Sequence, residues 1–147
     1  MTRLPDGASK DLTAAIIGAA IELHRHLGPG LLESAYEECL DWELRERGHT
    51  VARQLRVPII YKGATLESTY RLDLLVDDTV IVDIKAIDRV AEVHAAQLLT
   101  YLRLSDIEVG LLINFNSALL RDGIKRVVLA KRSAEVRGPS TASAVPN

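Results

Sequence analysis

The stretch YRLDLLVDDTVIVDIKA, at residues 70–86, consists mostly of two apolar runs separated by a turn, yet charged residues lie inside both runs. Asp73 lies in its first half, and Asp83 and Lys85 lie in its second half. Charged side chains are unfavourable to bury unless they are paired or bind a metal ion. Their types therefore allow two roles, which are an ion pair at a solvated end of a sheet and a metal site with a lysine beside it.

The two apolar runs predict a β-hairpin, and side chains alternate between the two faces of each strand. Whether Asp73 and Asp83 share a face therefore depends on how the two strands are aligned. A two-residue turn would place Asp73 and Asp83 on opposite faces. A three-residue loop centred on Asp78, or a bulge, would place them directly opposite each other on one face. In that second register, Arg71 and Lys85 share the same face.

Two carboxylates opposite each other repel, and a divalent cation between them would remove the repulsion. Hard oxygen ligands favour Mg²⁺ or Mn²⁺. Lys85 could then orient a water nucleophile or stabilise negative charge that develops on a phosphate. From spacing alone, a cross-strand ion pair between Asp73 and Lys85 remains the alternative.

The flanking segments supply the elements that would position these residues. Apolar residues at three- and four-residue spacing predict helices at 11–27, 31–47 and 91–104. Apolar runs bounded by turn residues predict strands at 51–61, 66–76, 79–86, 107–115 and 124–130. Pro58 indicates that the first strand is an edge strand or contains a bulge. This order predicts an α/β domain with a mixed sheet flanked by helices.

Composition is consistent with one domain. The chain has 147 residues, of which 48% are hydrophobic, and its formal net charge of −2 gives no overall basic field for nucleic acid. We expect a flexible lead-in at 1–10, a single domain at 11–133 and a disordered tail at 134–147. One cysteine and the lack of a long apolar segment favour a soluble, cytoplasmic protein without a membrane contact.

Two other stretches carry polar residues at helical spacing. GPGLLESAY places Gly30, Glu33 and Tyr36 in a G-x-x-E-x-x-Y pattern, and HAAQLLTYL places Gln97 and Tyr101 on a polar stripe beside an apolar face. Each has a structural alternative: an acid is favoured at a helix start by the helix dipole, and the glutamine and tyrosine could be an exposed i,i+4 pair.

Taken in order along the chain, these motifs resemble the G-x-x-E-x-x-Y protein family, which is placed in the PD-(D/E)xK nuclease-like superfamily. The resemblance extends from the first predicted helix to DGIKRVV at 122–128. It implies a restriction-endonuclease-like core of a helix, three strands, a helix and a strand, with a metal-dependent phosphodiesterase site. The family usually has glutamate where this chain has Asp83.

The resemblance also implies a ligand set. Glu33 matches the acid of the early helix, Asp73 matches the hairpin acid, and Asp83 matches the acid of the D/E-x-K pair. With the backbone carbonyl of Ile84 as a further ligand, these residues would hold Mg²⁺ or Mn²⁺.

The same resemblance gives roles to the remaining polar residues. Lys85 would position the attacking water, Gln97 would orient Lys85 or the water, and Tyr101 would support them. Tyr36 is expected to be a core aromatic whose hydroxyl touches the site, so that it flanks the same cavity, and His94 is left between a structural role and a role in the site.

The resulting prediction is a Mg²⁺-dependent nuclease that acts on DNA. A catalytically inactive binding or assembly protein that retains the nuclease fold is the alternative, because the chain is short and acidic. A homodimer or a partner protein could supply substrate recognition. A basic group near the carboxyl end is either a solvated face or a phosphate-contacting patch, and it consists of Arg121, Lys125, Arg126, Lys131 and Arg132.

Overall fold

A computed structural model describes residues 6–130 of the chain. Its elements, in chain order, are α1 (Asp6–Leu27), α2 (Glu33–Glu46), β1 (Val51–Tyr61), β2 (Ala64–Val76), β3 (Val80–Lys85), α3 (Glu92–Ser105), β4 (Val109–Asn114), the short 3₁₀ helix η1 (Leu120–Gly123) and β5 (Ile124–Val128). The predicted order of helices and strands is confirmed. The first helix begins at Asp6, so the expectation of a flexible lead-in is wrong for residues 6–10. The tail predicted at 134–147 lies outside the described residues.

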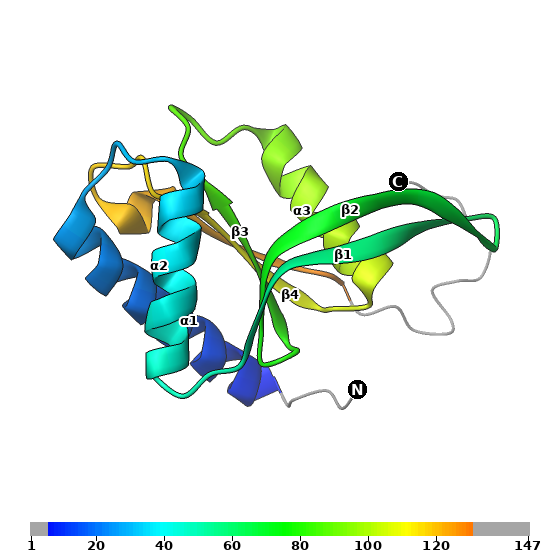
Figure 1. Cartoon of the computed structure of the whole chain (residues 1–147), viewed down its shortest axis with the longest axis horizontal. Coiled ribbons are helices and arrows are strands. Elements are labelled where there is room, and N and C mark those ends of the chain that lie inside the picture. The colour runs from blue at the N-terminus through cyan, green and yellow to red at the C-terminus, as the bar shows by residue number, and fades with distance from the viewer. Residues whose placement is uncertain (1–5, 131–147) are drawn as a thin grey trace.

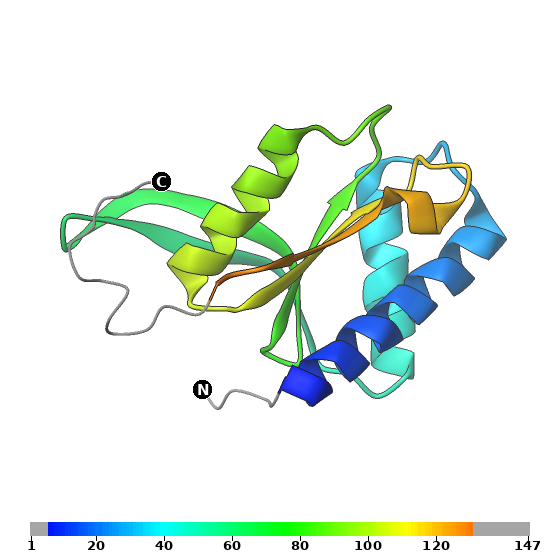
Figure 2. The same cartoon turned by 180° about the vertical axis from the view of Figure 1, so that it is seen from behind.

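The five strands form one mixed sheet in the order β1-β2-β3-β4-β5. β3 and β4 are parallel and the other neighbours are antiparallel. α1 and α2 cover one face of the sheet, and α3, which connects the parallel strands, covers the other (Figure 1, Figure 2). This is the α/β architecture that the sequence predicts.

The central strands are buried on both faces, as their near-continuous apolar sequences require. Val82 and Ile84 pack against α1 and α2, whereas Ile81 packs against α3. The side chains of Asp83 and Lys85 have the same parity as Ile81, so they belong to the face covered by α3. Within residues 6–130, no helix is long and apolar enough to cross a membrane.

β1 and β2 continue past the rest of the sheet as a two-stranded arm (Figure 1). β2 pairs with β3 only through residues 74–76, so residues 64–73 have β1 as their strand partner. β1 is an edge strand, and its register shifts between Pro58 and Ile60. Both readings of Pro58, as an edge and as a bulge, are therefore confirmed.

Asp77 joins the β2–β3 loop to the connection between α2 and β1. Its carboxylate accepts hydrogen bonds from the Thr50 amide at 2.8 Å and the Thr50 hydroxyl at 3.1 Å, and it lies 2.8 Å from Nδ1 of His49. Burial acts to raise the pKa of Asp77, but the contacts with His49 and Thr50 outweigh it and lower the pKa. The ionised carboxylate therefore stabilises the native state.

We expect Asp77→Asn to lower the free energy of unfolding by about 1–2 kcal/mol at pH 7. Because the pKa of Asp77 is lower in the native state than in the unfolded state, this contribution is complete above the unfolded pKa and is lost as pH falls through the native pKa. Urea unfolding of both proteins at pH 7 and at about pH 3 measures the change. A difference that is equally large at both values would contradict a role for the charge.

Candidate active site

The β2–β3 hairpin places Asp73 opposite Asp83. Backbone pairing between the strands runs from the loop to Leu74 and Val82, and the loop between them contains three residues, with Asp78 at the centre. One further step in this register aligns the two aspartates on one face. The structure thus selects the three-residue loop from the alternatives that the sequence left open.

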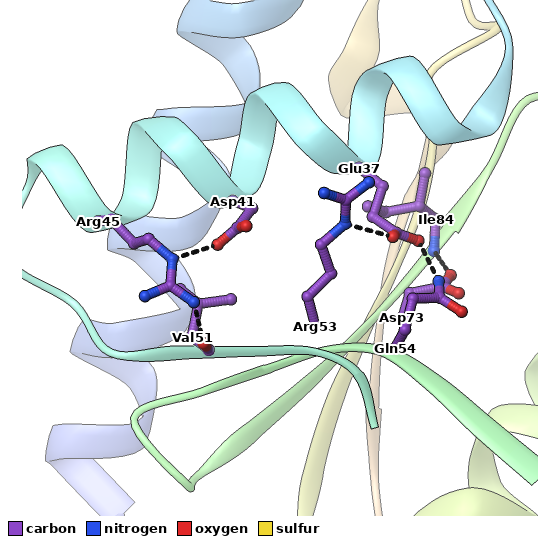
Figure 3. A network of polar contacts seen from close by, with 8 residues as sticks. All are labelled: Glu37, Asp41, Arg45, Val51, Arg53, Gln54, Asp73 and Ile84. Atoms are coloured by element: carbon purple, nitrogen blue, oxygen red, sulfur yellow. Dashed lines mark hydrogen bonds and ion pairs between the residues drawn. The ribbon is translucent and has the colours of Figure 1, made fainter. Parts of the chain in front are cut away.

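The two strands separate at this point. The Ile84 amide, which is the next donor on β3, hydrogen-bonds to Oδ2 of Asp73 at 2.8 Å rather than to the backbone of β2 (Figure 3). The N–H and C=O groups of one strand residue point toward the same neighbour. The Ile84 carbonyl therefore points into the opening beside Asp73.

Asp83 is the most buried of the three acids predicted to bind metal, with 6% of its surface exposed. Its Oδ1 lies 3.5 Å from Nζ of Lys85. Its Oδ2 is buried and has no hydrogen-bond partner among residues 6–130. A buried carboxylate oxygen without a partner is unfavourable, and a bound cation would satisfy it. This donor set of carboxylate and carbonyl oxygens fits Mg²⁺ or Mn²⁺.

Both aspartates resist ionisation. Burial is the main cause that raises the pKa of Asp73 to about 7. The hydrogen bond from the Ile84 amide lowers this pKa, and the negative charge of Asp83 raises it. Burial also raises the pKa of Asp83, where Lys85 opposes it and Glu33 adds to it. Paired carboxylates in a partly dry site are expected to behave in this way.

Residues from both helices reach the same place. A cavity of about 130 Å³ lies between the hairpin, α2 and α3. Its lining includes all six side chains predicted to be catalytic, namely Glu33, Asp73, Asp83, Lys85, Gln97 and Tyr101. The sequence-distant members, Glu33 and Gln97, thus converge on the charged face of the hairpin as predicted.

Glu33 stands at the rim of this cavity. It is the first residue of α2, it is exposed, and its Oε2 accepts a hydrogen bond from the Ala86 amide at 3.2 Å. Among residues 6–130, no three carboxylate, histidine or cysteine side chains stand close enough together to form an ion site by themselves. Asp73 and Asp83 are therefore the primary pair, with Glu33 beyond them.

Two expectations about the site require correction or restriction. Tyr36 does not line the cavity, because it is fully buried and stacks on Phe115 with ring centroids 4.5 Å apart. Its hydroxyl donates to the Gly28 carbonyl at 2.6 Å and accepts from the Leu31 amide at 3.1 Å, so it orders the loop that leads to α2. His94 accepts a hydrogen bond from the Ala91 amide and caps α3, which is a structural role.

Three residues beside the site were missed. Glu37 is 6% exposed, and its two carboxylate oxygens contact Nε of Arg53 and Nε2 of Gln54, each at 2.7 Å (Figure 3). Its charge helps to raise the pKa of Asp73. Glu37 lies one helical turn after Glu33, and this spacing on one helix face was the signal that could have indicated it.

The basic group near the carboxyl end does not line this cavity. Lys125 and Arg126 lie on β5, at the sheet edge opposite to β1, and Arg121 lies on η1 beside it. Lys131 and Arg132 lie outside the described residues.

Comparison with known proteins gives one match. The sequence profile of the PD-(D/E)XK nuclease superfamily matches residues 10–127, which include β1 to β4, all but the last residue of β5 and all the cavity residues named above. Searches of curated proteins and of solved structures found no significant match. The mixed sheet, the splayed hairpin with its D-x-K sequence and this match lead to one conclusion: the chain belongs to the PD-(D/E)XK nuclease superfamily.

Proposed function

We propose that this protein is a metal-dependent nuclease that hydrolyses phosphodiester bonds of DNA, and that it belongs to the G-x-x-E-x-x-Y branch of the superfamily. The observation that carries the proposal is the pairing of Asp73 with Asp83. The two carboxylates meet where the strands part, one of their buried oxygens has no partner within residues 6–130, and Lys85 lies beside them. A purely structural ion pair would not require the second aspartate.

Asp73, Asp83 and the Ile84 carbonyl would hold Mg²⁺ or Mn²⁺, with Glu33 contributing from the rim. A cation bound there would neutralise charge on the phosphate and lower the pKa of a bound water. In its absence, the raised pKa of Asp73 keeps a proton on the pair near neutral pH. Metal binding must displace this proton, so the affinity should increase with pH up to about 7.

The other cavity residues act on the water and the substrate. Nζ of Lys85 would hydrogen-bond to the attacking water and hold it against the phosphorus atom. The amide of Gln97 would fix the orientation of that water or of Lys85. Burial, together with the charges of Asp83 and Asp73, raises the pKa of Tyr101, so its phenol stays protonated and can donate a hydrogen bond to a phosphate oxygen.

Tyr36 would act on this site indirectly, through the loop before α2. Its hydroxyl bridges Gly28 and Leu31, and Gly30, between them, has a φ of 106° that side chains disfavour. Gly30 and Tyr36 of the G-x-x-E-x-x-Y pattern would therefore fix the start of α2, and this would hold Glu33 at the rim of the cavity.

Cleavage of DNA by the purified chain tests the proposal. We expect degradation of linear or plasmid DNA with Mg²⁺ or Mn²⁺, and none with EDTA. Asp83→Asn, purified in parallel, controls for contaminating nucleases, because only activity of this chain disappears with that substitution. If wild type and Asp83→Asn samples are equally inactive, or equally active, across metals and substrates, the rival role of a non-catalytic binding or assembly protein is favoured.

A further inference from the structure

The β1–β2 arm carries a local positive charge that the whole chain does not have. The formal net charge of the chain is −2. Between residues 53 and 71, however, the only acidic residue is Glu67, and there are four basic residues, namely Arg53, Arg56, Lys62 and Arg71. The arm as a whole is therefore a cationic surface on an acidic protein.

Two of these arginines are direct cross-strand partners. Arg56 on β1 pairs with Arg71 on β2, and both are exposed. Like charges directly opposite each other destabilise a sheet. Arg56 makes a 3.4 Å hydrogen bond to Thr69, but within residues 6–130 neither arginine forms an ion pair. Arg53 differs, because Glu37 neutralises it. An anion between Arg56 and Arg71 would remove their repulsion.

Arg71 faces the catalytic opening, and Arg56 lies directly opposite it on β1, on the same face of the arm. Arg71 lines the catalytic cavity together with Asp73, whereas its neighbours on β2, Tyr70 and Leu72, pack in the hydrophobic cluster around α3. Arg71 lies two residues before Asp73 on the same strand, which is about 7 Å at the usual rise of a strand. The long side chain of Arg71 thus reaches the surroundings of the paired carboxylates.

A groove on the surface connects the catalytic cavity with Arg71. An open depression of about 900 Å³ lies between the start of α2, the arm and α3. It shares four lining residues with the smaller catalytic cavity, namely Glu33, Arg71, Asp73 and Tyr101. A chain of phosphates whose scissile bond lies at the carboxylates would therefore pass Arg71 as it leaves the cavity.

From this placement we propose that Arg56 and Arg71 form a phosphate-binding pair, which holds the DNA backbone along the arm next to the cleaved bond. The inference rests on the proposed function for the identity of the substrate. Arginine suits this role because its planar guanidinium binds phosphate oxygens in a bidentate manner. The contacts are to the backbone, so they should give affinity without base specificity.

Salt-dependent binding of the full chain to labelled DNA oligonucleotides in EDTA, where metal-dependent cleavage is prevented, tests the pair. Each of Arg56→Gln and Arg71→Gln should lower the slope of log Kobs against log salt by about 0.9 for duplex DNA, or about 0.7 for a single strand. At about 0.1 M salt this corresponds to a five- to eightfold loss of affinity. Thermal unfolding should show an unchanged or higher Tm, because the repulsion is relieved.

Lys125→Gln is the matched control, because it removes one exposed positive charge at the opposite edge of the sheet. It should leave the slope for DNA unchanged. Unchanged slopes in both arginine variants, an equal loss in Lys125→Gln, or no binding by the wild-type chain would each overturn the proposal. Equally tight, equally arginine-dependent binding of polyglutamate would replace DNA by an acidic peptide as the occupant.

The same variants separate this inference from the proposed function. Metal-dependent cleavage with wild-type binding by both arginine variants would contradict the phosphate pair and leave the nuclease assignment intact. Arginine-dependent binding in a protein that never cleaves would support the pair and contradict the nuclease.

Discussion

Lys85→Met is expected to lower the rate of Mg²⁺-dependent DNA cleavage by about 10²- to 10³-fold, the usual effect of removing one preorganised electrostatic contact to the reacting groups. Methionine keeps most of the aliphatic length of the lysine, so the packing beside Asp83 is retained. Only the ammonium group, 3.5 Å from Oδ1 of Asp83, is lost. Single-turnover cleavage at saturating protein measures the effect, because it removes differences in substrate binding.

Lys125→Met is the matched control for this substitution. It makes the same chemical change on β5, outside the catalytic cavity, and should cleave at the wild-type rate. Circular dichroism should show that both variants are folded. Wild-type cleavage by Lys85→Met, or an equal loss in both variants, would contradict the role assigned to Lys85.

Asp73→Asn should abolish metal-dependent cleavage and at the same time raise the Tm in metal-free buffer at pH 8. The substituted side chain keeps an oxygen that can accept the hydrogen bond from Ile84. It removes the partly buried charge that faces Asp83. Allowing for the partial exposure of Asp73, we expect a gain of about 1–2 kcal/mol, or roughly 2–8 °C in Tm for a chain of this size.

The pH dependence gives the sign of this effect. The pKa of Asp73 is raised from 3.8 to about 7 in the native state, so between these values the native state binds more protons than the unfolded state. The wild-type protein without metal should therefore lose stability as pH rises from about 4 to about 7. Asp73→Asn should not show this contribution. If Asp73 were a simple partner of Lys85, its removal would lower the Tm at pH 8 regardless of metal.

Much of the fold could be predicted because periodicity reports local structure. The apolar spacing predicted the order of the three α-helices and five strands, though not the short helix η1, and Pro58 correctly indicated an edge and a bulge. The start of α1 was predicted too late because its apolar period begins only at Leu12. The preceding Ala8 and Lys10 are good helix formers that carry no such period.

Residue types alone could not predict the loop length of the β2–β3 hairpin. Asp77 and Asp78 both adopt positive φ values, of 51° and 54°, which aspartate tolerates better than most residues. Such residues suit a two-residue turn and a three-residue loop alike. Since one residue of register moves Asp83 to the other face of the sheet, the pairing of the carboxylates required the structure.

Tertiary contacts account for what the sequence did not show. Tyr36 was expected at the cavity from its place in a motif, yet the direction of its hydroxyl depends on the loop at Gly28. Gln54 has a φ of 54° and is bonded to Glu37, and nothing in its residue type indicates this conformation. Glu37 itself was detectable only as a second acid on the face of Glu33.

We propose above that Asp73 and Asp83 together hold a divalent cation. Calorimetric titration of Mn²⁺ into the wild-type protein and Asp73→Asn at pH 8 and pH 6 tests it directly. We expect one site in the wild-type protein, about tenfold tighter at pH 8 than at pH 6 because a proton must leave a group with a pKa of about 7, and no corresponding site in Asp73→Asn. A wild-type protein that binds no Mn²⁺ at pH 8, or a variant that binds it with wild-type affinity, would contradict the claim.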